Sequence, residues 1–239
     1  MQATKFEFEH RFWIIAAIFG IGFALSAFDI SAIVALRHLI APGIKPGNPG
    51  AAMFAHGVIG LGTLLTAGAA MLRTWGSAYL RTEVVHDTNQ HAEALVADGP
   101  FRFTRNPLYF ANLPMAAGIG LLASRAGWFF MVAGNWFFVY RLIFREEAAL
   151  RQTQGESYLA YCRAVPRFWP ALAPRVPGSG RRPAWGQAFV GEMFTWLFAI
   201  AELVIAISLN AAAGLAVFAV GFVAHFASVP LLRKFSRGS

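Results

Sequence analysis

Residues 51–72 read AAMFAHGVIGLGTLLTAGAAML, a run without a single charged side chain. About 20 apolar residues are enough for a helix to cross the hydrocarbon core of a bilayer, so this run predicts a membrane-spanning helix. The rest of the 239-residue chain has the same character, with 57% hydrophobic residues, 13% charged residues and a mean hydropathy of +0.52. Ordinary soluble domains carry about 25% charged residues, so the composition excludes that class as well as a disordered chain.

Five further apolar stretches lie on either side of this run. They cover residues 12–40, 107–124, 127–144, 188–209 and 211–232. We therefore predict an all-α polytopic membrane protein with about six transmembrane helices and cytoplasmic interfacial helices. The first stretch is long enough to tilt or to end in an interfacial turn. It is also far longer than a signal-peptide core, so we expect it to remain in the protein.

The basic residues follow the predicted spans. With the N-terminus inside, every lysine and arginine falls on one side of the membrane except Arg37, Lys45 and Arg125. This bias is typical of the cytoplasmic face, so both termini are expected there, and the formal charge of +8 does not require nucleic acid as a partner. Arginine outnumbers lysine, which favours a bacterial protein of the inner membrane. Segments 73–106 and 145–187 hold most of the polar residues on this side, where a water-soluble cofactor would bind.

The chain divides into two predicted domains. A linker rich in proline and glycine, PGSGRRP at 177–183, separates them. Residues 1–176 would form a core of four spans with the cytoplasmic segments, and residues 184–239 would form a helical hairpin of two spans.

The sequence GPFRFTRNPLY at 99–109 leads into a membrane helix. Asn106 is the expected N-cap, and Pro107 takes the first helical position, where its missing N–H has no cost. A helix N-terminus carries free N–H groups and partial positive charge, and Arg105 adds a forked donor, so this turn could bind a carboxylate or phosphate. The alternative is an ordinary helix start at a cytoplasmic boundary, which arginine often marks.

Two adjacent carboxylates, Glu146 and Glu147, follow the fourth predicted span. On a helix they point about 100° apart, so one could face a cleft while the other stays in solvent. The alternative is a weak surface ion pair between Glu147 and Arg151 at i and i+4. Tyr158 and Tyr161 share a helix face further on, where an interfacial aromatic belt is the default explanation.

Three motifs now stand in order around two spans: GPFRFTRNPLY at 99–109, REEAALRQTQGESYLAY at 145–161 and VPRFWP at 165–170. Together, over about residues 72–170, they resemble the integral-membrane isoprenylcysteine carboxyl methyltransferase and phospholipid methyltransferase family. The resemblance implies an S-adenosyl-L-methionine cofactor on the cytosolic side and a lipid or isoprenoid-type acceptor entering from the bilayer. By position it implies a cofactor site made of Arg105, Asn106, Pro107, Tyr109, Glu146, Glu147, Tyr158, Tyr161 and Arg167. Arg105, Glu146 and Glu147 are the expected catalytic residues.

The chain departs from the family pattern in two places. Asn106 stands where the family commonly has histidine, which excludes a titrating group there but leaves amide hydrogen bonding to the cofactor. The hairpin after Arg167 is an addition, because family members often end soon after that motif.

Other polar or glycine-rich features have structural explanations as well as functional ones. Gly57-x-x-Gly60-x-Gly62 lies inside a span, so it indicates close helix packing and not a nucleotide loop. His86 and His91 lie in a polar loop without the convergent spacing of a metal site, and no metal is predicted. Asp29, Glu192, Glu202 and His225 lie at predicted membrane depth, where ionisable groups either pair between helices, for instance glutamate with histidine, or line a cavity such as an acceptor pocket.

The sequence leaves several alternatives open. A transporter or a scaffold with a basic face for anionic lipids is one, and a membrane reductase with a nicotinamide cofactor is another. The methyl acceptor, the oligomeric state and the choice between Glu146 and Glu147 as the residue that faces the cofactor are not determined.

Overall fold

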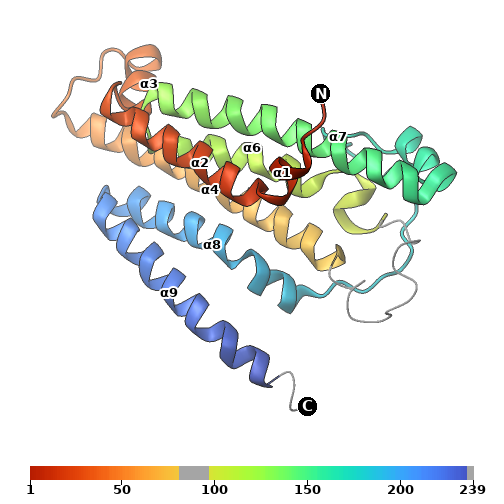
Figure 1. Cartoon of the computed structure of the whole chain (residues 1–239). Coiled ribbons are helices and arrows are strands. Elements are labelled where there is room, and N and C mark those ends of the chain that lie inside the picture. The colour runs from red at the N-terminus through yellow and green to blue at the C-terminus, as the bar shows by residue number, and fades with distance from the viewer. Residues whose placement is uncertain (81–96, 236–239) are drawn as a thin grey trace.

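The computed structural model describes residues 1–80 and 97–235, and these residues form a helical bundle (Figure 1). The helices are α1 (Lys5–Glu9), α2 (Arg11–Ala24), η1 (Leu25–Ala27), α3 (Ala32–Ile40), α4 (Pro49–Leu80), η2 (Gly99–Arg102), α6 (Pro107–Gly120), α7 (Arg125–Ala164), α8 (Trp185–Ser208) and α9 (Ala211–Phe235). The all-α prediction is confirmed for the described residues.

Within residues 1–80 and 97–235, three helices are long and apolar enough to cross a membrane, judged by length and composition: α4, α7 and α8. The 30 residues of α7 that precede its kink at Gly155 reach about 45 Å at 1.5 Å per residue, about one and a half times the thickness of a hydrocarbon core. The C-terminal part of α7 therefore extends beyond any membrane that the helix crosses.

The predicted count of six spans is not confirmed. The stretch 12–40 divides into α2, η1 and the nine-residue α3, and α6 has only 14 residues. Asp29 accounts for the first break, because it lies between η1 and α3 and accepts the backbone N–H of Ala126 at the start of α7. That hydrogen bond, helped by Ile30 and Arg125, lowers the pKa of the Asp29 carboxyl group despite the opposing effect of burial.

The long helix α4 packs along both α6 and α8, so it lies between the motif-bearing helices and the C-terminal hairpin. A buried ion pair joins α4 to α8: Arg73 Nε donates to Glu192 Oε2 over 2.7 Å, and Ser77 Oγ donates to Glu192 Oε1 over 2.6 Å. Arg73 also donates to the amide oxygen of Asn112 on α6 over 3.2 Å. Glu192 is thus paired, but with arginine and not with histidine. The pair crosses the predicted boundary between two domains, and that division stays a prediction.

Two glycine pairs allow helices to approach closely. Gly62 of the predicted glycine pattern lies at the crossing of α4 and α6, where a Cβ atom would come within 3.1 Å of the carbonyl oxygen of Gly118. An added Cβ atom on Gly57 or Gly60 would have no atom within 4 Å, so of these three glycines Gly62 alone is needed for close helix packing. At the second crossing, α2 meets α7, and a Cβ atom on Gly127 would collide with the carbonyl oxygen of Gly22.

We expect Gly127→Ala to lower the free energy of unfolding by about 1–3 kcal/mol, the usual cost of overpacking, because a backbone carbonyl cannot move aside like a flexible side chain. Gly20→Ala is the matched control, since nothing lies within 4 Å of its Cβ position. Unfolding in detergent measures both variants. Equal stability of Gly127→Ala and the native protein would show that α2 and α7 do not cross there.

The N-terminus lies against the far part of α7. Arg141 forms an ion pair with Glu7 at 2.8 Å, and Arg145 donates to the carbonyl oxygen of Ala3 over 3.0 Å. The N-terminal residues therefore lie at the same end of the molecule as the predicted acidic motif. The side of the membrane that this end faces stays a prediction.

Candidate functional site

The turn before α6 leads into a proline at the first helical position, and it is hydrogen-bonded to residues 166 and 168 of a second segment of the chain. Asn106 is the N-cap and Pro107 the first helical residue, as predicted, but the Asn106 side chain does not cap the helix. The backbone N–H of Arg105 donates to the carbonyl oxygen of Pro166, and Thr104 Oγ1 donates to that of Phe168. The first and third motifs are thus bound together side by side.

Beyond the apolar part of α7, the chain reverses direction at Gly155, whose φ of 54° and ψ of −130° lie outside helical values. Only glycine adopts such a backbone without strain, because it has no Cβ atom. The reversal buries Tyr158 and Tyr161 against Val165, and Tyr161 Oη donates to the carbonyl oxygen of Phe101 over 2.7 Å. Tyr161 therefore supports the turn at Phe101, and because both tyrosines are buried they are not an interfacial aromatic belt.

Glu147 lies at the centre of the site and is 1% exposed. Its carboxylate is within 3.3 Å of Arg105, 3.0 Å of Arg167 and 3.5 Å of Arg151. The Asn106 amide donates to it over 3.4 Å and to the carbonyl oxygen of Arg167 over 2.9 Å. Both the expected pair with Arg151 and the expected cluster with Arg105 are therefore present.

Glu146 faces a different helix. Tyr109 Oη of α6 donates to Glu146 Oε1 over 2.8 Å, and Glu146 is half-buried. The expectation that one of the two glutamates stays in solvent was wrong, because α7 is packed against other chain segments on both of the faces that Glu146 and Glu147 occupy.

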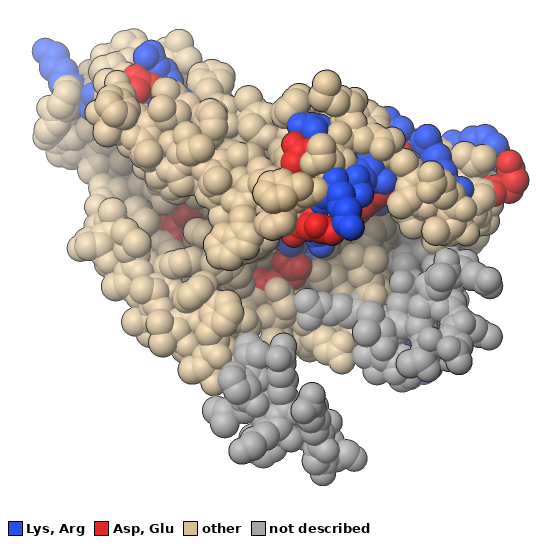
Figure 2. Space-filling view, viewed as in Figure 1, with Lys and Arg blue, Asp and Glu red and all other residues tan. Residues whose placement is uncertain are grey.

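The cluster of Arg105, Arg151, Arg167 and Glu147 carries three guanidinium groups for one carboxylate. The Arg105 side chain is only 8% exposed, and its Nε atom has no hydrogen-bond partner among the described residues. Figure 2 shows the lysine and arginine side chains gathered mainly at the end of the molecule where α7 finishes. The arrangement therefore has an excess of positive charge and an unused donor, which suits an anionic group.

The structure brings most of the predicted site residues together, and it places Tyr158 and Tyr161 in the packing beside the site. Arg105, Asn106, Glu147 and Arg167 meet in one cluster, and Tyr109 and Glu146 form a pair between α6 and α7. The sequence did not indicate the role of Thr104, which lies in the motif at 99–109 and donates a hydrogen bond to the carbonyl oxygen of Phe168 in the third motif. Among the described residues, no three His, Cys, Asp or Glu side chains are placed to hold a metal ion. His86 and His91 lie outside the described residues.

Comparison with known proteins identifies the segment that contains α6 and most of α7. A family model described as phospholipid methyltransferase matches residues 58–157. The resemblance to the phospholipid methyltransferase family is confirmed over these residues. Together with the three apolar helices, it indicates an integral membrane protein with a segment that is similar to membrane methyltransferases.

The methyltransferase match includes Arg105 to Tyr109 and both glutamates, but it ends before Tyr158, Tyr161 and Arg167. A curated relative is the cobalt-zinc-cadmium resistance protein CzcN of Cupriavidus metallidurans, 26% identical over 113 residues. This similarity covers 47% of the present chain and 49% of CzcN, so the chain spans about half the length of that relative. No solved structure matches the chain.

Proposed function

We propose that the protein transfers a methyl group from S-adenosyl-L-methionine to a lipid or isoprenoid-type acceptor in the membrane. The observation that carries this proposal is the buried carboxylate of Glu147 with three arginines around it, inside the segment that matches the methyltransferase family. Arg105 comes from the first motif, Glu147 from the second and Arg167 from the third.

The residues present suit this cofactor. Its amino-acid carboxylate would bind at Arg105, where a buried Nε has no partner and the first turn of α6 has no side-chain cap. The glutamates would accept hydrogen bonds from its amino group and ribose hydroxyls. Tyr158, Tyr161 and Arg167 would hold the turn and Glu147 in place.

When bound, the cofactor supplies a methyl group on a positively charged sulfur. That chemistry would be an in-line transfer of the methyl group to the acceptor, with Arg105 and the glutamates holding the cofactor. The contribution of the protein is then mainly positioning, which can supply about 7–11 kcal/mol. Rigid parts such as the Gly155 reversal and the paired segments 104–106 and 166–168 suit that role.

The two glutamates suit different tasks. Glu147 already forms ion pairs with Arg105, Arg151 and Arg167, so its oxygen atoms are occupied in holding the cluster together. Glu146 is paired with the neutral hydroxyl of Tyr109, so it is the better general base if the acceptor is an ammonium lipid. A carboxylate acceptor needs no base.

Calorimetry with the protein in lipid nanodiscs tests the cofactor. We expect micromolar affinity for S-adenosyl-L-methionine and for its demethylated product, and Arg105→Ala should weaken both by about 1.5–3 kcal/mol, the range for hydrogen bonds to charged groups. Arg163→Ala is the matched control, because that side chain is 71% exposed in a pair with Glu156. No binding by the folded native protein, or binding of a nicotinamide cofactor in its place, would contradict the proposal.

A further inference from the structure

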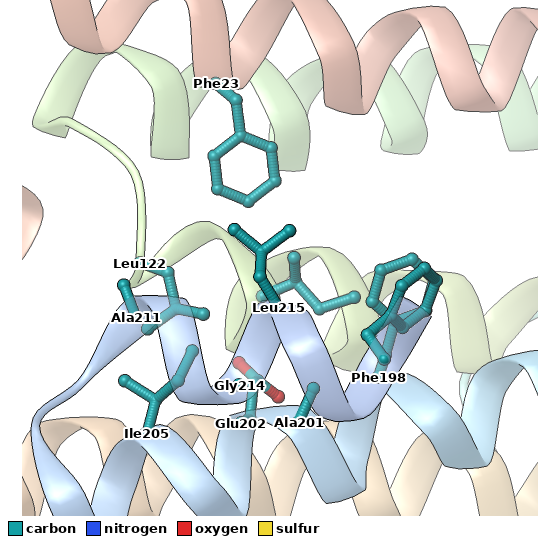
Figure 3. Close-up of a pocket in the computed structure, with 11 residues that line it drawn as sticks. Phe23, Leu122, Phe198, Ala201, Glu202, Ile205, Ala211, Gly214 and Leu215 are labelled. Carbon is teal, nitrogen blue, oxygen red and sulfur yellow. The ribbon is translucent and has the colours of Figure 1, made fainter. Parts of the chain in front are cut away.

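An apolar pocket of about 420 Å³ lies between α6, α8, α9 and the end of α2 (Figure 3). Phe23, Leu122, Phe198, Ile205 and Leu215 are among the side chains that line it, together with Glu202. The volume is within the range of sites for small ligands, about 300–1,000 Å³. Phe23 is 41% and Leu215 67% exposed, so the pocket opens on the side of the bundle, where lipid would surround an embedded protein.

Glu202 is the one ionisable residue among the eleven that line the pocket, and Figure 3 shows its carboxyl group among the apolar side chains. It is 2% exposed, and in the part of the chain that the structure describes neither of its oxygen atoms has a hydrogen-bond partner. The Thr66 hydroxyl of α4 is near this group, but the two do not reach hydrogen-bonding geometry. His56 of α4, which also faces α8, is bound to the carbonyl oxygen of Ala206.

The helix geometry separates the pocket from the candidate methyltransferase site. Ile119 lines the pocket and lies 13 residues after Asn106 on α6, which is about 20 Å at 1.5 Å per residue. Glu202 lies ten residues after Glu192 on α8, or about 15 Å from the buried pair with Arg73. The end of a bound molecule that lies at Glu202 is therefore too far from the candidate methyltransferase site to receive a methyl group there.

We propose that the pocket binds a lipophilic amine with a single hydrocarbon chain, whose protonated amino group pairs with the Glu202 carboxylate. An unpaired carboxylate in apolar surroundings is costly, and an ammonium group brings both the opposite charge and three N–H donors. The hydrocarbon chain lies along the apolar walls and leaves through the opening between Phe23 and Leu215. None of the eleven lining residues is basic, so a phospholipid amine, with its phosphate, does not fit. A fatty acid is excluded by like charge.

Photolabelling tests this proposal with two matched probes, dodecylamine and dodecanol, each with a diazirine on the part of the chain next to the head group. The native protein in phosphatidylcholine nanodiscs is irradiated with each probe, and mass spectrometry locates the labelled residues. We expect the amine to label the α8 and α9 residues that line the pocket. Glu202→Gln should reduce that labelling at least about tenfold, the lower end for a hydrogen bond to a charged group, and leave dodecanol labelling unchanged.

Glu9→Gln is the control variant, because Glu9 is an exposed carboxylate on α1, and its amine labelling should equal that of the native protein. Ala201→Phe provides a second test that does not depend on Glu202, since a large ring at a lining position should block both probes. Binding of S-adenosyl-L-methionine serves as the folding check for every variant. Amine labelling that is equal in Glu202→Gln and native protein, or that falls outside the pocket, would overturn the proposal.

Discussion

Replacing Glu147 with alanine is expected to lower the free energy of unfolding by about 3–5 kcal/mol, the usual cost of removing one partner from a buried ion pair. The change leaves Arg105, 8% exposed, without its counter-ion, and it removes the acceptor for the Asn106 amide. Sequence reasoning leads to a smaller effect, because on sequence alone Glu147 is a cofactor ligand on a helix surface. Its burial makes it a structural residue as well.

Unfolding of the purified protein in mixed micelles measures this effect. Glu156→Ala is the control, because Glu156 is 85% exposed and its pair with Arg163 spans 4.0 Å; a change of no more than about 1 kcal/mol is expected there. Glu147→Gln keeps a group of similar size and should lose less stability than Glu147→Ala. If Glu147→Ala and Glu156→Ala were equally stable, the cluster described here would not exist in the folded protein.

Arg73→Met is expected to destabilise the protein by a similar amount, about 3–5 kcal/mol, because it leaves Glu192 buried at 6% exposure without a cation. Of the neighbours described above, Ser77 would still donate a hydrogen bond to the Glu192 carboxylate, whereas the Asn112 side-chain oxygen would lose its donor, Arg73. The effect should appear as loosening of α8 from α4, since the pair joins these two helices.

The double variant Arg73→Met/Glu192→Leu tests the cause of that loss. It removes both charges, and buried pairs replaced by apolar residues of similar volume are often as stable as the original. We expect it to recover most of the stability that Arg73→Met loses, which unfolding measurements on all three proteins will show. A double variant that is less stable than either single variant would mean that the pair itself, and not the unpaired charge, holds the helices together.

The helical class and the start of α6 could be predicted because their signals are local. Hydropathy identifies apolar runs, and the Asn106–Pro107 step marks a helix start without reference to any other part of the chain. The number of spans could not be predicted in this way, since hydropathy does not show where Asp29 turns the chain to bind the start of α7.

The contacts within the site depend on segments far apart in the chain. Glu147 is 42 residues from Arg105, and the spacing of these two residues alone does not bring them together. The family resemblance placed them in one site. The burial of Tyr158 and Tyr161 was missed, because it follows from the reversal at Gly155. A glycine in the polar run RQTQGESY indicates that the helix is interrupted, but not the direction that the chain then takes.

The surroundings of the acidic residues at predicted membrane depth also depend on segments far apart in the chain. The sequence indicated that Glu192 and Glu202 needed either a partner or a cavity, because a charge in lipid is costly. Whether each glutamate has a partner or a cavity depends on the helices that face it. Arg73 of α4 pairs with Glu192, whereas Glu202 faces a pocket whose lining contains no basic residue.

Methyl transfer to lipid can be measured with a labelled methyl group. The protein is incubated in nanodiscs containing a total bacterial lipid extract with methyl-tritiated S-adenosyl-L-methionine, and the label in the organic phase is counted. We predict labelled lipid with the native protein and with Glu9→Gln, and none above background with Glu147→Gln that is shown to be folded. Native protein that binds the cofactor but labels no lipid, or Glu147→Gln that labels lipid as well as the native protein, would contradict this account.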